Sequence, residues 1–105
     1  MQFTSFLENG RLTVALTGEI DHHCAKHYIQ SIAGKIEAYT PEICILDFQE
    51  VSFVDSSGIA VVINALRAMT QIEGKLILSG LHPQPMRVFR ASGIDKIVMI
   101  KEAVS

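Results

Sequence analysis

The amino-terminal part of the chain alternates between apolar and polar residues. Within residues 11–17 every second residue is a large apolar one, and this period is typical of a half-buried β-strand. A shorter apolar stretch occupies residues 3–7, and the Asn9-Gly10 dipeptide that follows tolerates the positive φ angles of a tight turn. The pattern therefore predicts two strands joined as a β-hairpin.

Two later segments show the longer period that marks an amphipathic helix. The first begins after Asp21, a natural N-cap, and ends before Pro41. Its apolar stripe comprises Ala25, Ile29, Ile32, Ala33 and Ile36. The second begins near Asp55 and ends before Gly74, the expected glycine C-cap. Its apolar stripe comprises Ile59, Val62, Ile63, Leu66 and Met69.

Short apolar segments alternate with these helices. Residues 43–46 are almost wholly apolar, the pattern of a central strand covered on both faces. Residues 75–79 form the next predicted strand. Pro83 introduces a third helix that ends at a glycine C-cap around Gly93, and residues 97–100 supply a last strand.

The order of these elements predicts an α/β fold. We expect a mixed, largely parallel β-sheet with helices packed on it, because strands and helices alternate after the hairpin. The chain has 105 residues, of which 49% are hydrophobic and 19% charged, so it is long and apolar enough to bury one core. No linker or repeat divides it, and residues 1–105 are expected to form a single domain.

Charge and cysteine content narrow the classes of function. Nine basic and eleven acidic residues give a net charge of −2, a poor match for the phosphate backbone of nucleic acids. The longest segments free of Asp, Glu, Lys and Arg contain 11 residues, fewer than a membrane-spanning helix needs. No secretory signal is visible, and Cys24 and Cys44 are isolated from each other. We therefore expect a cytoplasmic protein without nucleic-acid or membrane partners, whose cysteines are reduced packing residues.

The most informative segment lies between a buried strand and the second long helix. Asp55, Ser56, Ser57 and Gly58 cluster where open α/β sheets usually hold their functional groups. One cap residue suffices to start a helix, so the additional hydroxyls favour a functional interpretation beside the structural one. A hydroxyl at a helix N-terminus is also a good phosphorylation site, because the helix dipole and the free amides tolerate the added dianion.

A second polar cluster occupies residues 18–23, at the turn into the first long helix. Its structural interpretation is a capped turn, with His22 and His23 exposed at the start of the helix. His23 and His27 are four residues apart, but no cysteine joins them, and we expect neither a metal nor another cofactor.

These two clusters resemble the signature segments of a known family. Residues 16–23 (LTGEIDHH) and 53–59 (FVDSSGI) are similar to the paired motifs of bacterial anti-sigma-factor antagonists, founding members of the STAS (sulfate transporter and anti-sigma antagonist) superfamily. The sporulation-type antagonist is the closest likeness. The similarity extends over nearly the whole chain, including residues 83–93.

The resemblance implies a regulatory switch and not an enzyme. In the family the first serine of the Asp-Ser-Ser-Gly motif accepts phosphate, which is Ser56 here, and the other cluster lies beside it at the partner-binding surface. The residues expected at that surface are Glu19, Asp21, His22, His23, Asp55, Ser57 and Gly58. The unphosphorylated protein would bind an anti-sigma factor and so release a sigma factor. That anti-sigma factor would also be the serine kinase, which binds the ATP, and a PP2C-type phosphatase would restore the serine.

The distribution of charge constrains how such a switch works. Residues 1–59 contain three basic and eight acidic side chains, whereas residues 60–105 contain six basic and three acidic ones. Both clusters lie in the acidic part and would attract a basic patch on a partner. Phosphate alone would strengthen that attraction, so we hypothesise that Ser56 enters a close, dehydrated contact with no room for a hydrated phosphate.

Three alternatives stay open at the level of sequence. A serine hydrolase would use Ser56 or Ser57 with a histidine base, although the GxSxG elbow is absent. A receiver-like switch would phosphorylate Asp47 at the end of the buried strand, although the early acidic pair and the later lysine of such a site are absent. A STAS module would also serve as a scaffold in a stress complex, a lipid-transporter subunit or a nucleotide-responsive domain.

Overall fold

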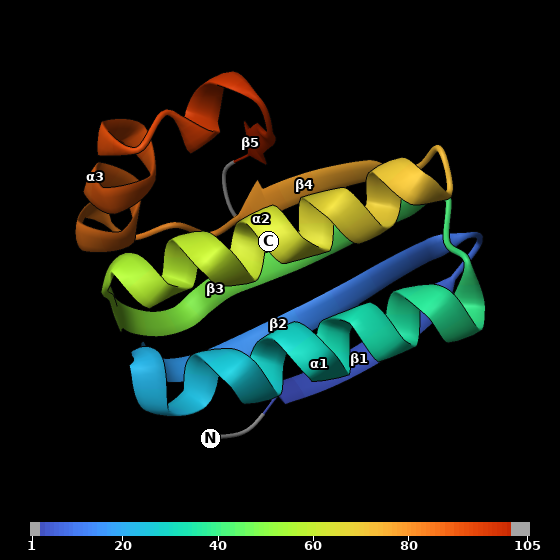
Figure 1. Cartoon of the computed structure of the whole chain (residues 1–105), viewed down its shortest axis with the longest axis horizontal. Coiled ribbons are helices and arrows are strands. Elements are labelled where there is room, and N and C mark those ends of the chain that lie inside the picture. The colour runs from blue at the N-terminus through green and yellow to red at the C-terminus, as the bar shows by residue number, and fades with distance from the viewer. Residues whose placement is uncertain (1–2, 102–105) are drawn as a thin grey trace.

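A computed structural model describes residues 3–101 as a five-stranded β-sheet with helices packed against it (Figure 1). The strands lie side by side in chain order, and only the first pair is antiparallel. They are β1 (Phe3–Glu8), β2 (Arg11–Ile20), β3 (Ile43–Val54), β4 (Lys75–Ser79) and β5 (Met99–Lys101). The predicted fold class is therefore confirmed. The predicted domain of residues 1–105 also includes residues 1–2 and 102–105, which lie outside the described part.

The β1–β2 hairpin turns at the dipeptide that the sequence predicted. Asn9 and Gly10 have φ angles of 53° and 77°, the left-handed region that a two-residue turn requires at both positions. The carbonyl of Gly10 also accepts a hydrogen bond from the Glu42 amide at 2.8 Å. The turn is thereby attached to the residue before β3.

Both β2 and β3 are longer than their alternation predicted. β2 continues through Gly18, which adopts a φ of 82° where the register against β3 shifts. β3 continues to Val54 instead of ending before Asp47, so Asp47 lies within the strand. The buried residues of β3 explain the error, because their spacing changes from two to three residues where the strand bulges. They are Cys44, Leu46, Phe48, Val51 and Val54.

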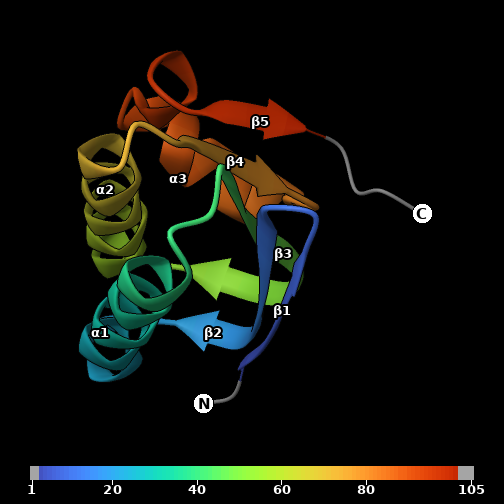
Figure 2. The ribbon, with the colours of Figure 1, turned by 90° about the vertical axis from the view of Figure 1, so that its right-hand side faces the viewer.

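Helices α1 (His22–Tyr39) and α2 (Ser56–Gln71) cover the same face of the sheet (Figure 2). The short α3 (Pro83–Ala91) lies at the end of the sheet where β3 finishes and α2 begins (Figure 1). A 3-10 turn, η1 (Ile94–Lys96), connects α3 to β5. All three predicted helices are present, and the last strand begins two residues later than predicted because η1 precedes it.

The buried faces of α1 and α2 are rotated slightly from the predicted stripes. In α1, Cys24 and Tyr28 are buried, whereas Ile29 and Ala33 are only half-buried. In α2 the buried residues are Gly58, Val61, Val62, Ala65 and Met69, and part of the predicted stripe flanks them. Gly58, at the start of this face, lets the backbone of α2 approach Val54 of β3 closely.

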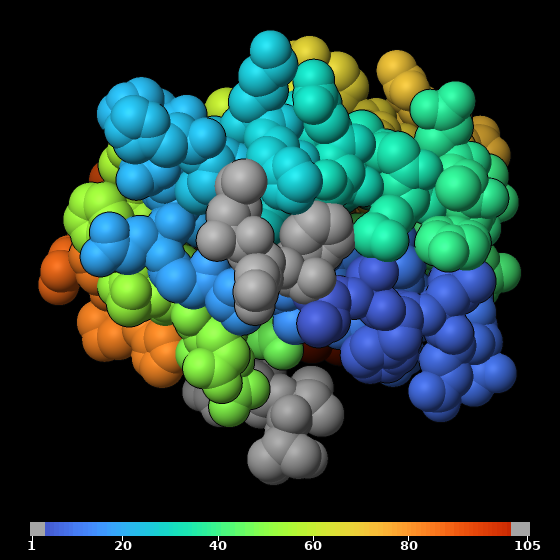
Figure 3. Space-filling view, turned by 90° about the horizontal axis from the view of Figure 1, so that it is seen from below, coloured from blue at the N-terminus to red at the C-terminus, as the bar shows by residue number. Residues whose placement is uncertain are grey.

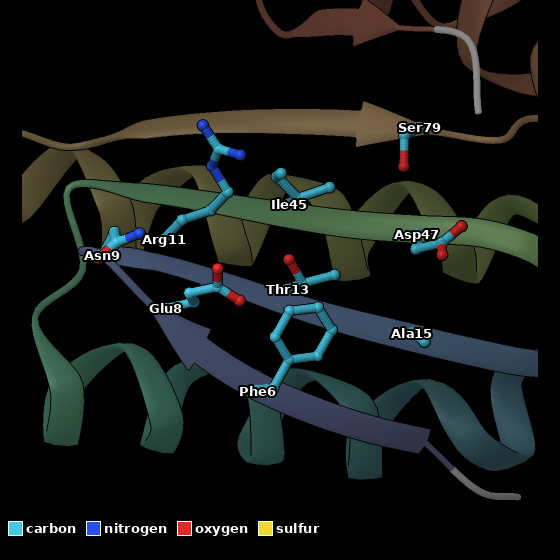
Figure 4. Close-up of a pocket in the computed structure, with 9 residues that line it drawn as sticks. All are labelled: Phe6, Glu8, Asn9, Arg11, Thr13, Ala15, Ile45, Asp47 and Ser79. Atoms are coloured by element: carbon cyan, nitrogen blue, oxygen red, sulfur yellow. The ribbon is translucent and has the colours of Figure 1, made fainter. Parts of the chain in front are cut away.

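The opposite face of the sheet is a correction to the sequence prediction. Ile45 and Asp47 of β3 are half-buried, so the strand is not covered by helices on both faces. A hollow of about 420 Å³ lies on this face, and Figure 4 shows the side chains that line it from β1 to β4. Phe6 is 59% exposed at its rim. Ile45, one of the residues whose pattern predicted a doubly covered strand, therefore lines an open hollow.

Two helix ends depend on left-handed backbone. Gly93 follows α3 with a φ of 84°, as predicted for a glycine C-cap. At the end of α2, however, the positive φ of 60° belongs to Glu73 and not to Gly74. Gly74 is needed for space instead, because a Cβ there would lie 2.4 Å from Met69 Cε and 3.0 Å from the Glu42 carbonyl oxygen.

The two cysteines are free and buried, as expected of packing residues. Burial raises the pKa of Cys44 to about 12, because the thiolate would lose its hydration. The thiol of Cys24 instead donates to the Glu19 carbonyl at 3.4 Å. Cys44 is therefore not available as a reactive thiolate in the folded state.

Candidate functional site

The carboxyl ends of β2 and β3 bring the two polar clusters together. In the parallel register Glu19 lies beside Phe53 and Ile20 lies beside Val54. The amide of Asp55 then donates to the Ile20 carbonyl at 3.1 Å. Figure 3 shows the two segments meeting on the surface, where light-blue atoms near residue 20 lie against yellow-green atoms near residue 53. The clusters are separated by more than thirty residues in the chain and form one surface.

The first cluster is a capped helix start. Asp21 accepts hydrogen bonds through Oδ1 from the amides of His23 at 2.9 Å and Cys24 at 3.3 Å. Desolvation raises the pKa of Asp21, but these amides and the nearby His23 outweigh it, so the net pKa lies below its usual value. His22 and His23 are exposed, with ring centroids 4.0 Å apart. The predicted capped turn is therefore present, and Glu19 is exposed beside it.

The second cluster caps α2 in the same way. Asp55 Oδ1 accepts from the Ser57 amide at 2.7 Å, which satisfies one of the free amides at the helix start. Ser56 is the first residue of α2 and is exposed, whereas Ser57 is half-buried. The structure thus presents Ser56 at the surface, at the positive end of the helix dipole.

The last residue of the second cluster, Gly58, must be a glycine because there is no space for a side chain. A Cβ at this position would lie 2.1 Å from Cγ1 of Val54, whose side chain is fully buried. Glycine therefore allows the first turn of α2 to pack directly on the last residue of β3. This position is structural, although it belongs to the same motif as Ser56.

An exposed aromatic side chain beside the clusters was not singled out from the sequence. Phe53 is 41% exposed, and its strand neighbour is Glu19. The sequence does not reveal this exposure, because Phe53 lies between Val51 and Val54, which are also apolar and are both buried. Exposed aromatic residues are frequent anchors of protein interfaces.

Two side chains from the start of α3 also reach this end of β3. Gln84 bonds both backbone groups of Val54, as acceptor from its amide at 2.9 Å and as donor to its carbonyl at 2.9 Å. His82 Nε2 lies 2.7 Å from the Gln49 carbonyl oxygen. Neither Gln84 nor His82 was among the residues predicted for the partner-binding surface.

The structure also bears on a metal site, on a membrane-spanning helix and on the receiver-like alternative at Asp47. Within residues 3–101 no group of three or more His, Cys, Asp or Glu side chains is arranged to hold a metal ion. No helix in the same span is long and apolar enough to cross a bilayer. Asp47 does not end its strand, and its Oδ1 accepts from the Gln49 amide at 2.9 Å. The premise of a receiver-like phosphorylation site at the end of a strand was therefore wrong.

Known proteins share both the sequence pattern and the fold. The STAS domain family model matches residues 7–105. An anti-sigma F factor antagonist of Lysinibacillus sphaericus is 31% identical over 88 residues, which cover 84% of this chain and 75% of that protein. The structure of the anti-sigma factor antagonist SpoIIAA in its unphosphorylated form is 27% identical and has a TM-score of 0.86, covering 99% of this chain and 90% of that one.

The phosphorylated form of the Bacillus cell fate determinant SpoIIAA is also similar. It has a TM-score of 0.78 at 27% identity, covering 99% of this chain and 93% of that one. The family model spans nearly the whole chain and both motif segments. This chain therefore belongs to the STAS domain family.

Proposed function

We propose that this protein is an anti-sigma factor antagonist controlled by phosphorylation of Ser56. In its unphosphorylated form it binds an anti-sigma factor and so frees a sigma factor for transcription. The anti-sigma factor is the serine kinase, and a PP2C-type phosphatase removes the phosphate. The protein itself is a substrate and a ligand, and carries out no catalysis.

The observation that carries the proposal is the exposed position of the Ser56 hydroxyl, which contrasts with the structural roles of Asp55 and Gly58. Asp55 serves as the helix cap, and Gly58 makes room for Val54. Ser56 is exposed, and no hydrogen bond of its hydroxyl is found within the described residues. Its side chain therefore has no structural role that competes with modification. The N-terminus of α2 stabilises an added anion, so phosphate is compatible with the fold.

The surface around Ser56 supports a role in binding another protein. Phe53 offers an exposed aromatic group, and the neighbouring imidazoles of His22 and His23 offer two further exposed rings. Carboxylates of Glu19 and Asp21 lie on the same turn, so the surface would attract a basic partner. We propose that Glu19, Asp21, His22, His23, Asp55 and Ser57 form the partner-binding surface, with Phe53 added. Gly58, also expected there, is buried under Val54 and shapes the surface through packing.

Phosphate must then weaken binding at short range. A phosphoserine adds about 1.5 to 2 negative charges, which long-range attraction to a basic partner would favour. We propose that the partner covers Ser56 in a dry contact, where a phosphate would lose hydration and lie close to Asp55. Steric and desolvation costs outweigh the attraction in this arrangement.

The test is a titration of the cognate anti-sigma factor with three forms of the protein. Wild type and Ser56→Ala are expected to bind with similar affinity, because the dry contact accepts a small side chain. Ser56→Asp is expected to bind at least tenfold more weakly, because a buried, unpaired carboxylate costs more than about 1.4 kcal/mol. Equal affinities for all three forms would contradict the proposal.

Phosphorylation is mapped in a parallel reaction. The protein is incubated with ATP and the anti-sigma factor, and mass spectrometry locates the phosphate. Ser57→Ala is the matched control, since Ser57 is the neighbouring hydroxyl of the same motif. We expect phosphate to be found on Ser56 in Ser57→Ala, whatever the rate, whereas Ser56→Ala stays unmodified. Phosphate on Ser57 alone would keep the class of function and move the site.

A further inference from the structure

The second half of β3 is not paired with β4, the strand that pairs with its first half. β4 pairs with β3 only as far as Asp47 and Ser79, whereas β3 continues to Val54. On the other edge, β2 stays paired with β3 up to the pair formed by Ile20 and Val54. The last residues of β3, which lead into the Ser56 turn, therefore have a strand on one side only.

The start of α3 supplies hydrogen bonds on the free edge. His82 Nε2 donates to the Gln49 carbonyl at 2.7 Å, because a carbonyl oxygen can only accept. Further along, the Gln84 side chain accepts from the Val54 amide and donates to the Val54 carbonyl, both at 2.9 Å. A primary amide presents a donor and an acceptor as a peptide group does. Gln84 thus takes the place of a residue on a neighbouring strand.

Val54 holds the turn that carries Ser56 in position. Its side chain packs under Gly58 of α2, and the residue after it, Asp55, is both bonded to Ile20 and the cap of α2. Gln84 holds the Val54 peptide groups from the opposite side. Together these contacts set the direction in which the chain enters α2. They therefore also set the position of Ser56.

α3 has few other attachments that would do the same. Pro85 and Phe89 are its buried residues, and the Phe89 ring meets Phe48 edge to face at a centroid distance of 5.5 Å. Phe48 lies further back on β3 than Val54, six residues before the strand ends. Among residues 3–101, the Gln84 amide is therefore the hydrogen-bonded link between α3 and the last residue of β3.

We infer that Gln84 is a positioning residue for phosphorylation at Ser56, an inference that rests on the proposed function. Its amide holds the turn in the geometry in which the Ser56 hydroxyl meets the kinase. A kinase reaction requires the attacking oxygen to be in line with the transferred phosphoryl group. Loss of the amide therefore lowers the rate of phosphoryl transfer more than it lowers the affinity for the kinase.

The first measurement concerns the free protein and needs no kinase. Gln84→Met keeps the length of the side chain and removes both hydrogen bonds. We expect the Val54 amide to exchange with solvent deuterium at least tenfold faster than in wild type, because its acceptor is lost. The Ser56 amide resonance is expected to move as well. Unchanged exchange at Val54 would overturn the inference.

A second variant makes the link sensitive to pH. In Gln84→Glu the protonated carboxyl retains one donor and one acceptor, whereas the ionised carboxylate can only accept and faces the Val54 carbonyl. The Ser56 amide shift is therefore expected to show a titration step above about pH 4.3 in addition to any step that wild type shows. Gln30→Glu, at an exposed position of α1, is the matched control and should not show it. Absence of the step in Gln84→Glu would also overturn the inference.

The third measurement separates positioning from binding. Initial rates of Ser56 phosphorylation are measured against the concentration of each variant. Gln84→Met is expected to lower kcat roughly tenfold and to change KM less than about twofold. An unchanged kcat in a variant that has lost Val54 protection would overturn the inference. If wild type itself is not phosphorylated, the proposed function fails, while amide exchange and the pH titration still decide whether Gln84 holds the turn.

Discussion

At the scale of single residues, Gly58 shows how one motif serves both the core and the surface. A side chain is excluded there because Val54 Cγ1 lies 2.1 Å from the position that a Cβ would occupy, whereas Ser56, two residues earlier, is exposed. Val54 is fully buried in a densely packed core and has little space into which it can retreat. The glycine of the motif is therefore fixed by packing, whatever binds the surface.

Gly58→Ala is expected to destabilise the protein by about 1–3 kcal/mol, because the added methyl overpacks a rigid contact. The free energy of unfolding is measured by urea denaturation. Gly34→Ala is the matched control, since Gly34 is a helical glycine of α1 with open space around its Cβ position. That control should gain about 0.5–1 kcal/mol from helix propensity. Equal effects at the two positions would show that the Val54 contact is not rigid.

At the scale of elements, the helices and the hairpin were predictable because their signals are local. Asp21 is the N-cap that was predicted, Asp55 caps the second helix at its predicted start, and Asn9-Gly10 forms the turn. The carboxyl half of β3 was not predictable, because bulges change the spacing of its buried residues and hide the period of two. The contribution of Gln84 to the site was hidden for a related reason, since it acts through a contact thirty residues away in the chain.

The end of α2 shows where a local rule assigned the wrong residue. Gly74 was expected to adopt the left-handed conformation, but Glu73 adopts it, and Gly74 is held close to Met69 and the Glu42 carbonyl. The amide of Gly74 still donates to the Met69 carbonyl at 2.8 Å, so the helix end is closed as expected. Tertiary packing against the segment before β3 therefore decides which residue must be the glycine.

Glu73→Gly is expected to stabilise the protein by up to about 1 kcal/mol. A left-handed conformation costs a residue with a side chain roughly 1–2 kcal/mol, and the greater flexibility of glycine in the unfolded chain offsets part of the gain. Thermal and urea unfolding both measure the change. Glu37→Gly, at an exposed position of α1, should instead lose about 1 kcal/mol. A loss of stability in Glu73→Gly would mean that the side chain contributes more than its backbone strain costs.

At the scale of the whole molecule, the arrangement separates the core from the proposed switch. The core lies between the sheet and the helices α1 and α2, which cover one face of the sheet (Figure 2). Ser56 is exposed as the first residue of α2, just after the end of β3. A phosphate at that position adds charge to the positive end of α2 without entering the core. The modification should therefore change what the surface binds and leave the fold intact.

Stability of the modified protein tests this separation. Ser56→Asp, and the phosphorylated protein itself, are expected to unfold in one cooperative transition with a free energy within about 1 kcal/mol of wild type. The favourable helix dipole and the repulsion from Asp55 act in opposite directions there. Gln71→Glu places an added negative charge at the other end of α2, where the dipole opposes it, and should lose about 0.3–1 kcal/mol. If phosphate at Ser56 instead costs several kcal/mol or broadens the transition, the switch works by loosening the fold, and a dry contact with the partner is not needed to explain release.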